Sequence, residues 1–342
     1  MNNTNSLVSI IMPVYNMGEQ LRDSIPKILK QTYKNIEVVL VDDGSSDNSL
    51  AVCNDFAQRD KRIKVIHQEN SGSGFARNAG IRAAEGKYAY FYDADDLLEE
   101  NAVEIMVETL EKNHCDLVVF GYRFCGLDGS VDRVKKFPLK ILDGSDVRKS
   151  YDKYIHMRNE FGIQGAPWNK MFSLDKIKEY NIEFPELRRH QDEVFIMRYV
   201  DKADRIIFIP DVLYNHFPND AAKVFQKFPE DYHEIVLSLL NYFMEYVYSW
   251  NPDNQEVLKE ICAVFINGIT KSLMLLFNPT RPMTFKERYV RVKEIAKKCT
   301  EAMPKDEYAY GSTLYKLMKK ERYFALYICS YLSLIKNKKN LR

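Results

Sequence analysis

Closely spaced cysteines are missing from this sequence of 342 residues, which contains no CxxC pair. The spacing of a metal site built from cysteines is therefore absent. Six cysteines occur, scattered along the chain and several of them inside apolar patterns: Cys53, Cys115, Cys125, Cys262, Cys299 and Cys329. This usage is typical of buried, reduced thiols in a cytoplasmic protein.

A long apolar run is missing as well. No stretch reaches the roughly 18 to 20 apolar residues that a membrane-spanning helix needs. At the N-terminus, residues 1–16 (MNNTNSLVSIIMPVYN) carry no basic segment before the apolar run and no small-residue cleavage site, and the run ends at Pro13. This pattern indicates a first β-strand and not a signal peptide.

The chain also lacks an excess of charge of either sign. Lys and Arg total 49 and Asp and Glu total 48, which gives a formal net charge of +1. No overall electrostatic attraction to nucleic acid is therefore expected. The apolar share of 46% and the charged share of 28% are those of a globular protein, and the length accommodates one large domain with a smaller addition.

Alternating strand and helix patterns fill the first 92 residues. Apolar runs predict strands at Leu7–Met12, Ile36–Val41, Ile63–His67 and Lys87–Tyr92, and amphipathic segments predict helices at Gly18–Gln31, Ser49–Arg59 and Phe75–Ala84. Alternation with short connections predicts an α/β fold with a parallel sheet and right-handed crossovers.

Three carboxylates follow the fourth predicted strand: Asp93, Asp95 and Asp96. On an extended backbone Asp93 and Asp95 project to the same side, roughly 6.5 Å apart at Cα, so they can share a ligand. Two hard oxygen donors suit Mg²⁺ or Mn²⁺ carrying a phosphate. The alternative is a polar turn before a helix, where Asp is favoured without any ligand.

Polar groups also follow the other predicted strands, in Pro13–Asn16, Asp42–Asp47 and Asn70–Asn78. Because the carboxyl ends of parallel strands meet at one edge of a sheet, we expect these loops and the Asp93 turn to form one site. Gly72 and Gly74 do not complete a dinucleotide fingerprint, since Arg77 occupies its sixth position.

Four motifs together carry a family resemblance: PVYN (13–16), VDDGSSD (41–47), ENSGSGFARNAG (69–80) and YDADD (92–96). In order and spacing they closely resemble the nucleotide-sugar half of the family 2 glycosyltransferases, which have the GT-A fold. The resemblance continues in PWNKMFSLDKI (167–177), RHQDEVFIMRYV (189–200) and IPDVLYNHFPND (209–220). Two positions depart from the family: Gln191 stands where a Glu is usual, and His216 where an Arg is often found.

The resemblance implies a GT-A catalytic domain over residues 1–228, with a mostly parallel central sheet flanked by helices. Residues 1–118 would form the nucleotide-sugar half and residues 119–228 the acceptor half. The implied reaction is the inverting transfer of a sugar from a nucleotide diphosphosugar, by resemblance a UDP-sugar, to a hydroxyl of a glycan in bacterial capsule or exopolysaccharide synthesis.

The resemblance also implies roles for single residues. Asp192 would be the general base, with an N-capping role compatible with it. Trp168 and Gln191 would contact the acceptor, although a core position is an equal alternative for Trp168. His216 is open between metal ligand, diphosphate donor and ordinary loop histidine. The nucleotide would contact Pro13, Tyr15, Asp42, Asp43, Arg77 and Asp93. Mn²⁺ or Mg²⁺ would bind Asp95 together with Asp93 or Asp96, with His216 as the candidate third ligand; the division of roles among the three carboxylates stays open.

Residues 229–342 change to helical patterns, at 232–250, 255–277 and 284–303. The tail 314–342 has eight basic residues around the apolar run Tyr323–Ile335, against Glu321 alone. Such a segment fits a basic amphipathic helix at an anionic leaflet, or equally a helix docked on the protein with solvated ends. In the membrane case we expect a lipid-linked acceptor and an enzyme at the cytoplasmic face of the cell membrane.

Two other functions stay open at this point. Transfer to a polyprenyl phosphate is compatible with the same fold, although such enzymes usually carry membrane spans. A non-catalytic module that binds nucleotide or glycan is suggested by the departures at Gln191 and His216.

Overall fold

The computed structural model describes residues 5–126, 128–156, 159–217 and 228–337. Contacts divide the chain into two compact units. The first comprises the described residues of 1–148, 153–187 and 191–218, and the second those of 149–152, 188–190 and 219–342. The domain boundary predicted after residue 228 lies beside residues 218–227, which are outside the described residues.

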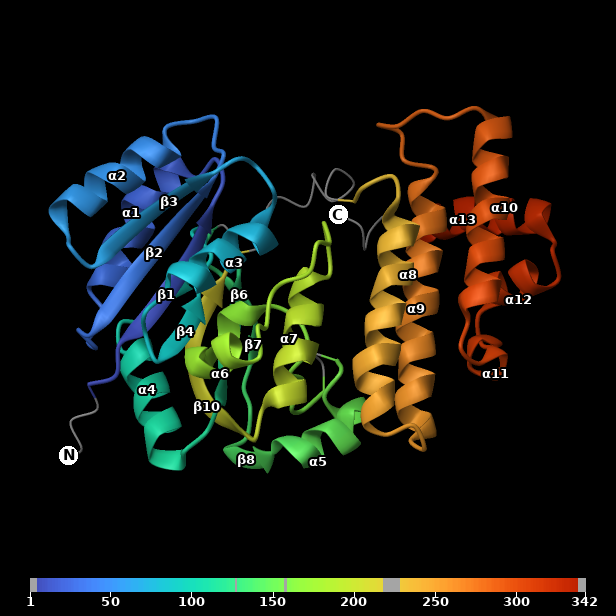
Figure 1. Cartoon of the computed structure of the whole chain (residues 1–342). Coiled ribbons are helices and arrows are strands. Elements are labelled where there is room, and N and C mark those ends of the chain that lie inside the picture. The colour runs from blue at the N-terminus through green and yellow to red at the C-terminus, as the bar shows by residue number, and fades with distance from the viewer. Residues whose placement is uncertain (1–4, 127, 157–158, 218–227, 338–342) are drawn as a thin grey trace. The chain divides into compact units, whose positions relative to one another are not determined.

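The strands and helices predicted for the first 92 residues are all confirmed, with ends that shift by one or two residues. They are β1 (Val8–Val14), α1 (Gly18–Leu29), β2 (Ile36–Asp43), α2 (Ser49–Arg59), β3 (Ile63–Gln68), α3 (Ser73–Ala83) and β4 (Tyr88–Phe91). Every residue of β2 is buried, as its continuous apolar run predicts. These elements form the blue and cyan part of the first unit in Figure 1.

The four strands pair in parallel in the order β3-β2-β1-β4. The chain moves outward from β1 to β3 and then returns to the other side of β1 to make β4. With right-handed crossovers this reversal puts α3 on the sheet face opposite α1 and α2. Gly80 allows α3 close to β1, since a Cβ there would lie 2.3 Å from Cγ2 of Ile11. Ligands of open α/β sheets bind at such a reversal, outside the strand ends.

The rest of the first unit makes the sheet mixed. Strand β9 (Lys170–Ser173) pairs antiparallel with β4 and with β6 (Leu117–Cys125), and β10 (Arg205–His216) runs parallel to β6. The shorter strands are β5 (Leu97–Leu98), β7 (Val131–Lys135) and β8 (Lys140–Asp143), and the remaining helices are α4 (Ala102–Asn113), α5 (Gly144–Lys149), α6 (Leu174–Glu179) and α7 (Gln191–Lys202). The predicted α/β class is confirmed, with its parallel part confined to β1–β4 and the β6–β10 pair.

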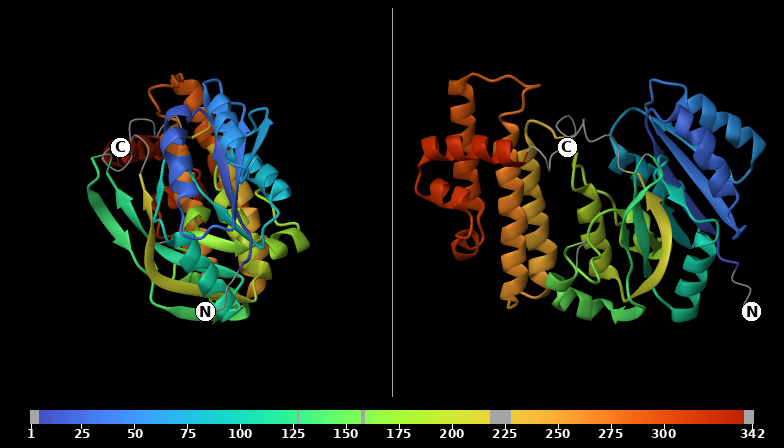
Figure 2. Two further views of the ribbon diagram at one scale, coloured as in Figure 1. Left: turned by 90° about the vertical axis from the view of Figure 1, so that its left-hand side faces the viewer. Right: turned by 180° about the vertical axis from the view of Figure 1, so that it is seen from behind.

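Strand β10 is long and bent, and Figure 2 shows it as a curved yellow arrow. Its pairing with β6 shifts register between Phe208 and Val212 and again between Val212 and Tyr214. Such irregularities bend a strand and re-aim its side chains. Tyr214 and His216, at the end of β10, thereby reach the turn that follows β4.

The second unit is helical, as predicted. It contains α8 (Tyr232–Tyr242) with a π-helical continuation at Phe243–Tyr248, α9 (Gln255–Leu275), α10 (Phe285–Ala302), α11 (Asp306–Ala309), α12 (Thr313–Lys319) and α13 (Tyr323–Asn337). The described part of the tail, up to residue 337, contains two helices where one amphipathic segment was predicted, and α13 packs on α9, α10 and α12. Of the helices that the structure describes, none combines the length and apolar character needed to cross a bilayer. All six cysteines are free thiols.

Candidate active site

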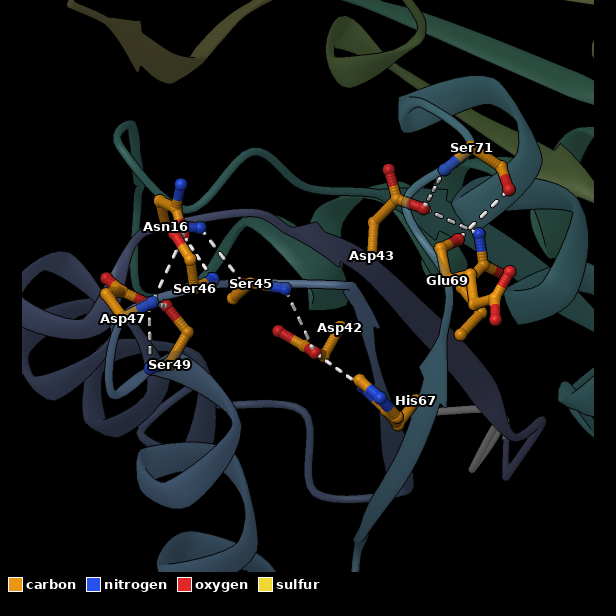
Figure 3. Close-up of polar contacts among 11 residues, drawn as sticks. Asn16, Asp42, Asp43, Ser45, Ser46, Asp47, Ser49, His67, Glu69 and Ser71 are labelled. Carbon is orange, nitrogen blue, oxygen red and sulfur yellow. Dashed lines mark hydrogen bonds and ion pairs between the residues drawn. The ribbon is translucent and has the colours of Figure 1, made fainter.

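The loops after β1 and β2 are tied together by short polar side chains (Figure 3). Asn16 has a positive φ of 52°, which Asn tolerates better than most residues. Its Oδ1 accepts from the backbone N–H of Ser46 at 2.8 Å and of Asp47 at 3.3 Å, and its own N–H donates to Oγ of Ser45 at 3.0 Å. The two loops therefore form one rigid rim at the carboxyl ends of β1 and β2.

Asp42 and Asp43 end β2 and point to different partners. Oδ2 of the fully buried Asp42 lies 2.7 Å from Nδ1 of His67 on β3. Asp43 accepts from the backbone N–H groups of Ser71 at 2.9 Å and Gly72 at 2.7 Å. Gly72 adopts φ +99°, a conformation that favours glycine. Both carboxylates thus shape the edge of the site, and Asp43 holds the start of α3.

Tyr15 is the exposed aromatic side chain of this rim. It follows β1 and is 50% exposed, whereas Pro13 is partly buried within β1. A half-exposed ring beside a rigid polar loop can stack on a planar ligand.

Arg77 lies between two carboxylates from distant parts of the chain. Its Nη2 donates to Oδ1 of Asp93 at 3.0 Å, and its Nη1 donates to Oδ1 of Asp192 at 3.0 Å. The Arg77 side chain is 6% exposed, against 28% for each carboxylate. Burial opposes the charge of Arg77, yet Asp192 and Asp93 raise its pKa above the ordinary value. Arg77 is therefore a buried cation and not a charge on the exposed surface of α3.

Asp192 lies in the first turn of α7, one residue after the helix begins, so it is not an N-cap residue. Burial raises its pKa to about 6, although the positive charge of Arg77 acts in the opposite direction. Near neutral pH the group is therefore mostly a carboxylate that can still accept a proton, the property a general base requires.

Lys170 is a second buried cation of this region. Its Nζ donates to the carbonyl of Ala166 at 2.8 Å and to Oδ1 of Asn169 at 2.6 Å. Burial lowers the pKa of Lys170 to about 7, and the charge of Asp192 limits this decrease. The same electrostatic interaction favours the ionised form of Asp192.

Asp96 differs from its two neighbours because the protein surrounds it. It is 1% exposed, and it accepts from the hydroxyl of Tyr214 at 2.6 Å and from the N–H of Phe217 at 2.7 Å. Its Oδ2 lies 2.9 Å from Nδ1 of His216. Asp96 therefore holds the end of β10 against the β4 turn, while Asp93 and Asp95 are only partly buried.

The His216 ring is fixed on more than one side. Nδ1 meets Asp96, and the ring stacks on Trp168 with centroids 5.2 Å apart at 14°. Burial works against the charged form, but Asp96 raises the pKa of His216 above its ordinary value. Trp168 is 5% exposed and also stacks on Tyr214 at 4.7 Å, so its burial favours the core alternative for this residue.

Gln191 joins the beginnings of α7 and α3. Its Nε2 donates to Oγ of Ser73 at 2.6 Å. Asn78, further along α3, forms hydrogen bonds with both the N–H and the carbonyl of Phe184. These contacts place α3 beside the segment before α7, which explains how Arg77 reaches Asp192.

Direct contacts join part of the predicted site, whereas Pro13, Tyr15, Asp42 and Asp43 belong to the separate rim at the ends of β1 and β2. Asp93, Arg77 and Asp192 are in contact, and His216 reaches the same turn through Asp96. Within the described ranges there is no cluster of three or more His, Cys, Asp or Glu side chains arranged to hold a metal ion. The sequence reasoning missed Lys170 as an ionisable group, although its motif PWNK was recognised.

Comparison with known proteins shows the family to which the chain belongs. The chain matches the family model described as Glycosyl transferase family 2 over residues 9–180. It is 33% identical to glycosyltransferase GlyG of Streptococcus pneumoniae over 221 residues, which are 61% of this chain and 69% of GlyG. It is 40% identical to an uncharacterized glycosyltransferase of Haemophilus influenzae over 220 residues, 64% of this chain and 79% of that protein.

Solved structures share the fold. The crystal structure of S. aureus TarS 1–349 in complex with UDP-GlcNAc aligns with a TM-score of 0.66 at 21% identity, over 97% of this chain and 91% of that one. The mannosyltransferase PcManGT from Pyrobaculum calidifontis, in complex with GDP-Man and Mn²⁺, aligns with a TM-score of 0.53 at 16% identity over 97% and 87%. At these identities the likeness concerns the fold, whereas the family match covers half of the chain: the protein belongs to glycosyl transferase family 2.

Proposed function

We propose that residues 1–228 form a metal-dependent, inverting glycosyltransferase that moves a sugar from a nucleotide diphosphosugar to a hydroxyl of a glycan. The observation that carries this proposal is the ion-pair bridge from Asp93 through Arg77 to Asp192. It joins a partly exposed carboxylate at the end of β4, suited to the donor, to a carboxylate with a raised pKa, suited to the acceptor.

The donor site would use the rim formed by the loops after β1 and β2. Tyr15 offers a half-exposed ring for the base, and Pro13, near the end of β1, would lie beside it. Asp42 and Asp43, both enclosed by protein donors, would shape the nucleotide site from behind. UDP-sugar is our preferred donor class, supported by the likeness to TarS, whose structure contains UDP-GlcNAc. Residues 1–118 would form this half and residues 119–228 the acceptor half.

A Mn²⁺ or Mg²⁺ ion would bind at the β4 turn, where the described residues form no preformed cluster of three ligands. Asp93 and Asp95 supply oxygen donors, and a diphosphate commonly completes the coordination of such ions. His216 would have to move closer to act as a further ligand; Asp96 already engages its Nδ1, as carboxylates do for metal-binding histidines. When bound, the ion would offset the charge of the leaving diphosphate. With its raised pKa, His216 is equally suited to donate to a phosphate oxygen as an imidazolium.

Asp192 would act as general base. With a pKa of about 6, roughly nine tenths of the groups are ionised at pH 7. The carboxylate would take the proton from the acceptor hydroxyl while that oxygen bonds to the anomeric carbon and the bond to the diphosphate breaks on the opposite side. A single displacement of this kind inverts the anomeric centre. Gln191 would line the acceptor side of the same helix start.

The acceptor would be a growing surface polysaccharide, carried as a lipid-linked glycan at the cytoplasmic face of the cell membrane. The basic helical tail supports this location. In transfer to a polyprenyl phosphate, the acceptor oxygen near Asp192 would be that of a phosphate, which carries no hydroxyl proton at neutral pH for a general base to remove. In a non-catalytic binding module, Asp192 would have no catalytic role.

A nucleotide-release assay tests the proposal. We expect purified protein with Mn²⁺ or Mg²⁺ to release UDP from a UDP-sugar when a glycan acceptor is present, and to stop when the ion is chelated. Asp192→Asn should retain UDP binding and lose transfer. Asp201→Asn, at the other end of α7, is the matched control. Failure to turn over any of a panel of UDP- and GDP-sugars would favour the binding module.

A further inference from the structure

Helix α13 carries an apolar stripe on its exposed side. Its five side chains are between 40% and 61% exposed and recur at i, i+4, i+7, i+8 and i+11, the spacing of one helix face. We call them the α13 stripe: Phe324, Ile328, Tyr331, Leu332 and Ile335. Another face of α13 is buried, at 9% exposure or less, through Leu326, Tyr327, Ser330 and Leu334.

The buried face fixes α13 within the second unit. The ring of Tyr327 packs against Phe277 at 5.0 Å and Phe285 at 5.1 Å, and its hydroxyl accepts from Nη1 of Arg288 at 3.1 Å. The stripe is therefore a stable surface feature and not the result of a loosely attached helix.

Charge is distributed around the stripe in a particular way. Residues 323–335 contain no charged side chain, and Glu321 is the only acid in the segment 314–342. The sequence after α13 adds three more basic residues, which lie outside the described residues. Exposed basic side chains stand before and after the stripe: Lys316, Lys320, Arg322 and Lys336.

We propose that the α13 stripe docks into the headgroup region of an anionic lipid bilayer, with the helix lying in the plane of the membrane. A helix of 15 residues, ~22 Å long, is suited to lie in the interface. The apolar side chains enter the acyl boundary, and the basic side chains at both ends meet anionic headgroups.

A second copy of the chain fits the stripe less well. Five half-exposed side chains offer roughly 400 Å², in the range of functional surface patches but about half of what a stable dimer buries per partner. A two-fold contact would also bring the basic flanks of both copies together. Docking would hold the enzyme where lipid-linked acceptors lie, and only this purpose rests on the proposed function.

Co-sedimentation of the full chain with vesicles tests the docking. We expect binding to vesicles of phosphatidylcholine with 25% phosphatidylglycerol, weakened by salt, and little binding to pure phosphatidylcholine. Phe324→Ser with Leu332→Ser should weaken binding by about tenfold or more. Lys320→Gln with Arg322→Gln should weaken it about fivefold for each charge removed. Leu139→Ser, at a 69% exposed site in the first unit, is the control and should bind normally.

Circular dichroism and thermal unfolding establish that each variant is folded before binding is compared. Equal binding to both vesicle types, no binding of the unmodified chain, or unchanged binding of the Phe324/Leu332 variant would each overturn the proposal. A dimer that dissociates in this variant, seen by light scattering, would assign the stripe to a second copy instead. None of these measurements needs sugar transfer, so a failed turnover assay would not be mistaken for failed docking.

Discussion

Replacing Arg77 by methionine should move the pH dependence of transfer to higher pH. Nη1 of Arg77 lies 3.0 Å from Oδ1 of Asp192. Taking the two charges to be ~4 Å apart, their attraction is about 4 kcal/mol at an effective dielectric constant of ~20. This corresponds to about three pKa units. Because the Asp192 side chain is 28% exposed, solvent screening reduces the effect, and we expect one to two units.

The pKa of Asp192 would then rise from about 6 to roughly 7 or 8. The carboxylate form accepts the proton, so activity is present above this pKa and lost as the pH falls through it. At pH 7 the ionised fraction should fall from about 0.9 to between roughly 0.1 and 0.5. The acidic limb of kcat/KM should shift to higher pH by the same one to two units, and activity should recover near pH 9.

The assay is kcat/KM for nucleotide release between pH 5 and 9, compared with Arg82→Met. Arg82 lies on the same helix but forms an exposed pair with Glu183, so its loss should leave the profile unchanged. Thermal unfolding of each variant must be measured as well, since removing one partner of a buried ion pair can lower the free energy of unfolding by about 3–5 kcal/mol. A folded Arg77→Met variant whose acidic limb stays where it was would refute the electrostatic link between Arg77 and Asp192.

Two further residues give independent predictions. Burial lowers the pKa of Lys170 to about 7, so above this pH the unfolded chain binds more protons than the folded one. The free energy of unfolding should therefore increase on the order of 3 kcal/mol as the pH rises from 7 towards 9.5. Urea unfolding of Lys170→Met should lack this increase, and a parallel pH dependence in both proteins would contradict the assignment. His216→Ala should raise the Mn²⁺ concentration for half-maximal activity by about 10–100-fold, and Asp96→Asn should act in the same direction; titrations that match the unmodified chain would exclude a metal role for His216.

Local sequence patterns were sufficient to predict the four parallel strands β1 to β4, although not the parallel pair of β6 and β10. The strand at Ile36–Val41 is apolar almost throughout because it is covered on both faces. It ends in the polar residues Asp42 and Asp43. The convergence of strand ends follows from the topology of any parallel sheet. Hydrogen bonds link the loops that the sequence grouped together: Asn16 joins the loops after β1 and β2, Asp43 joins the segment before α3, and Arg77 of α3 joins Asp93.

The same patterns could not separate the three carboxylates after β4. Asp96 is hydrogen-bonded to Tyr214 and His216, which are 118 and 120 residues away in the chain. No local periodicity encodes a contact over that distance. It depends on the irregular pairing that bends β10, and that irregularity has no pattern of its own in the sequence.

The tail shows a different limit of sequence reasoning. A helix that is apolar on every side gives no indication of which face the protein covers. Packing of Tyr327 on Phe277 decides this, and it leaves the α13 stripe outside. The basic residues at both ends were visible in the sequence, but the surface that they flank exists only once the helix is docked.

The bridge through Arg77 has a consequence that neither carboxylate would have alone. The family resemblance suggested a contact of Arg77 with base or phosphates, whereas the structure has its guanidinium shared between Asp93 and Asp192. Because one buried cation serves both, a change in the charge or position of Asp93 alters the electrostatic environment of Asp192. Any ligand that engages Asp93 must therefore also act on the carboxylate proposed to accept the proton, which couples the two halves of the site through a single side chain.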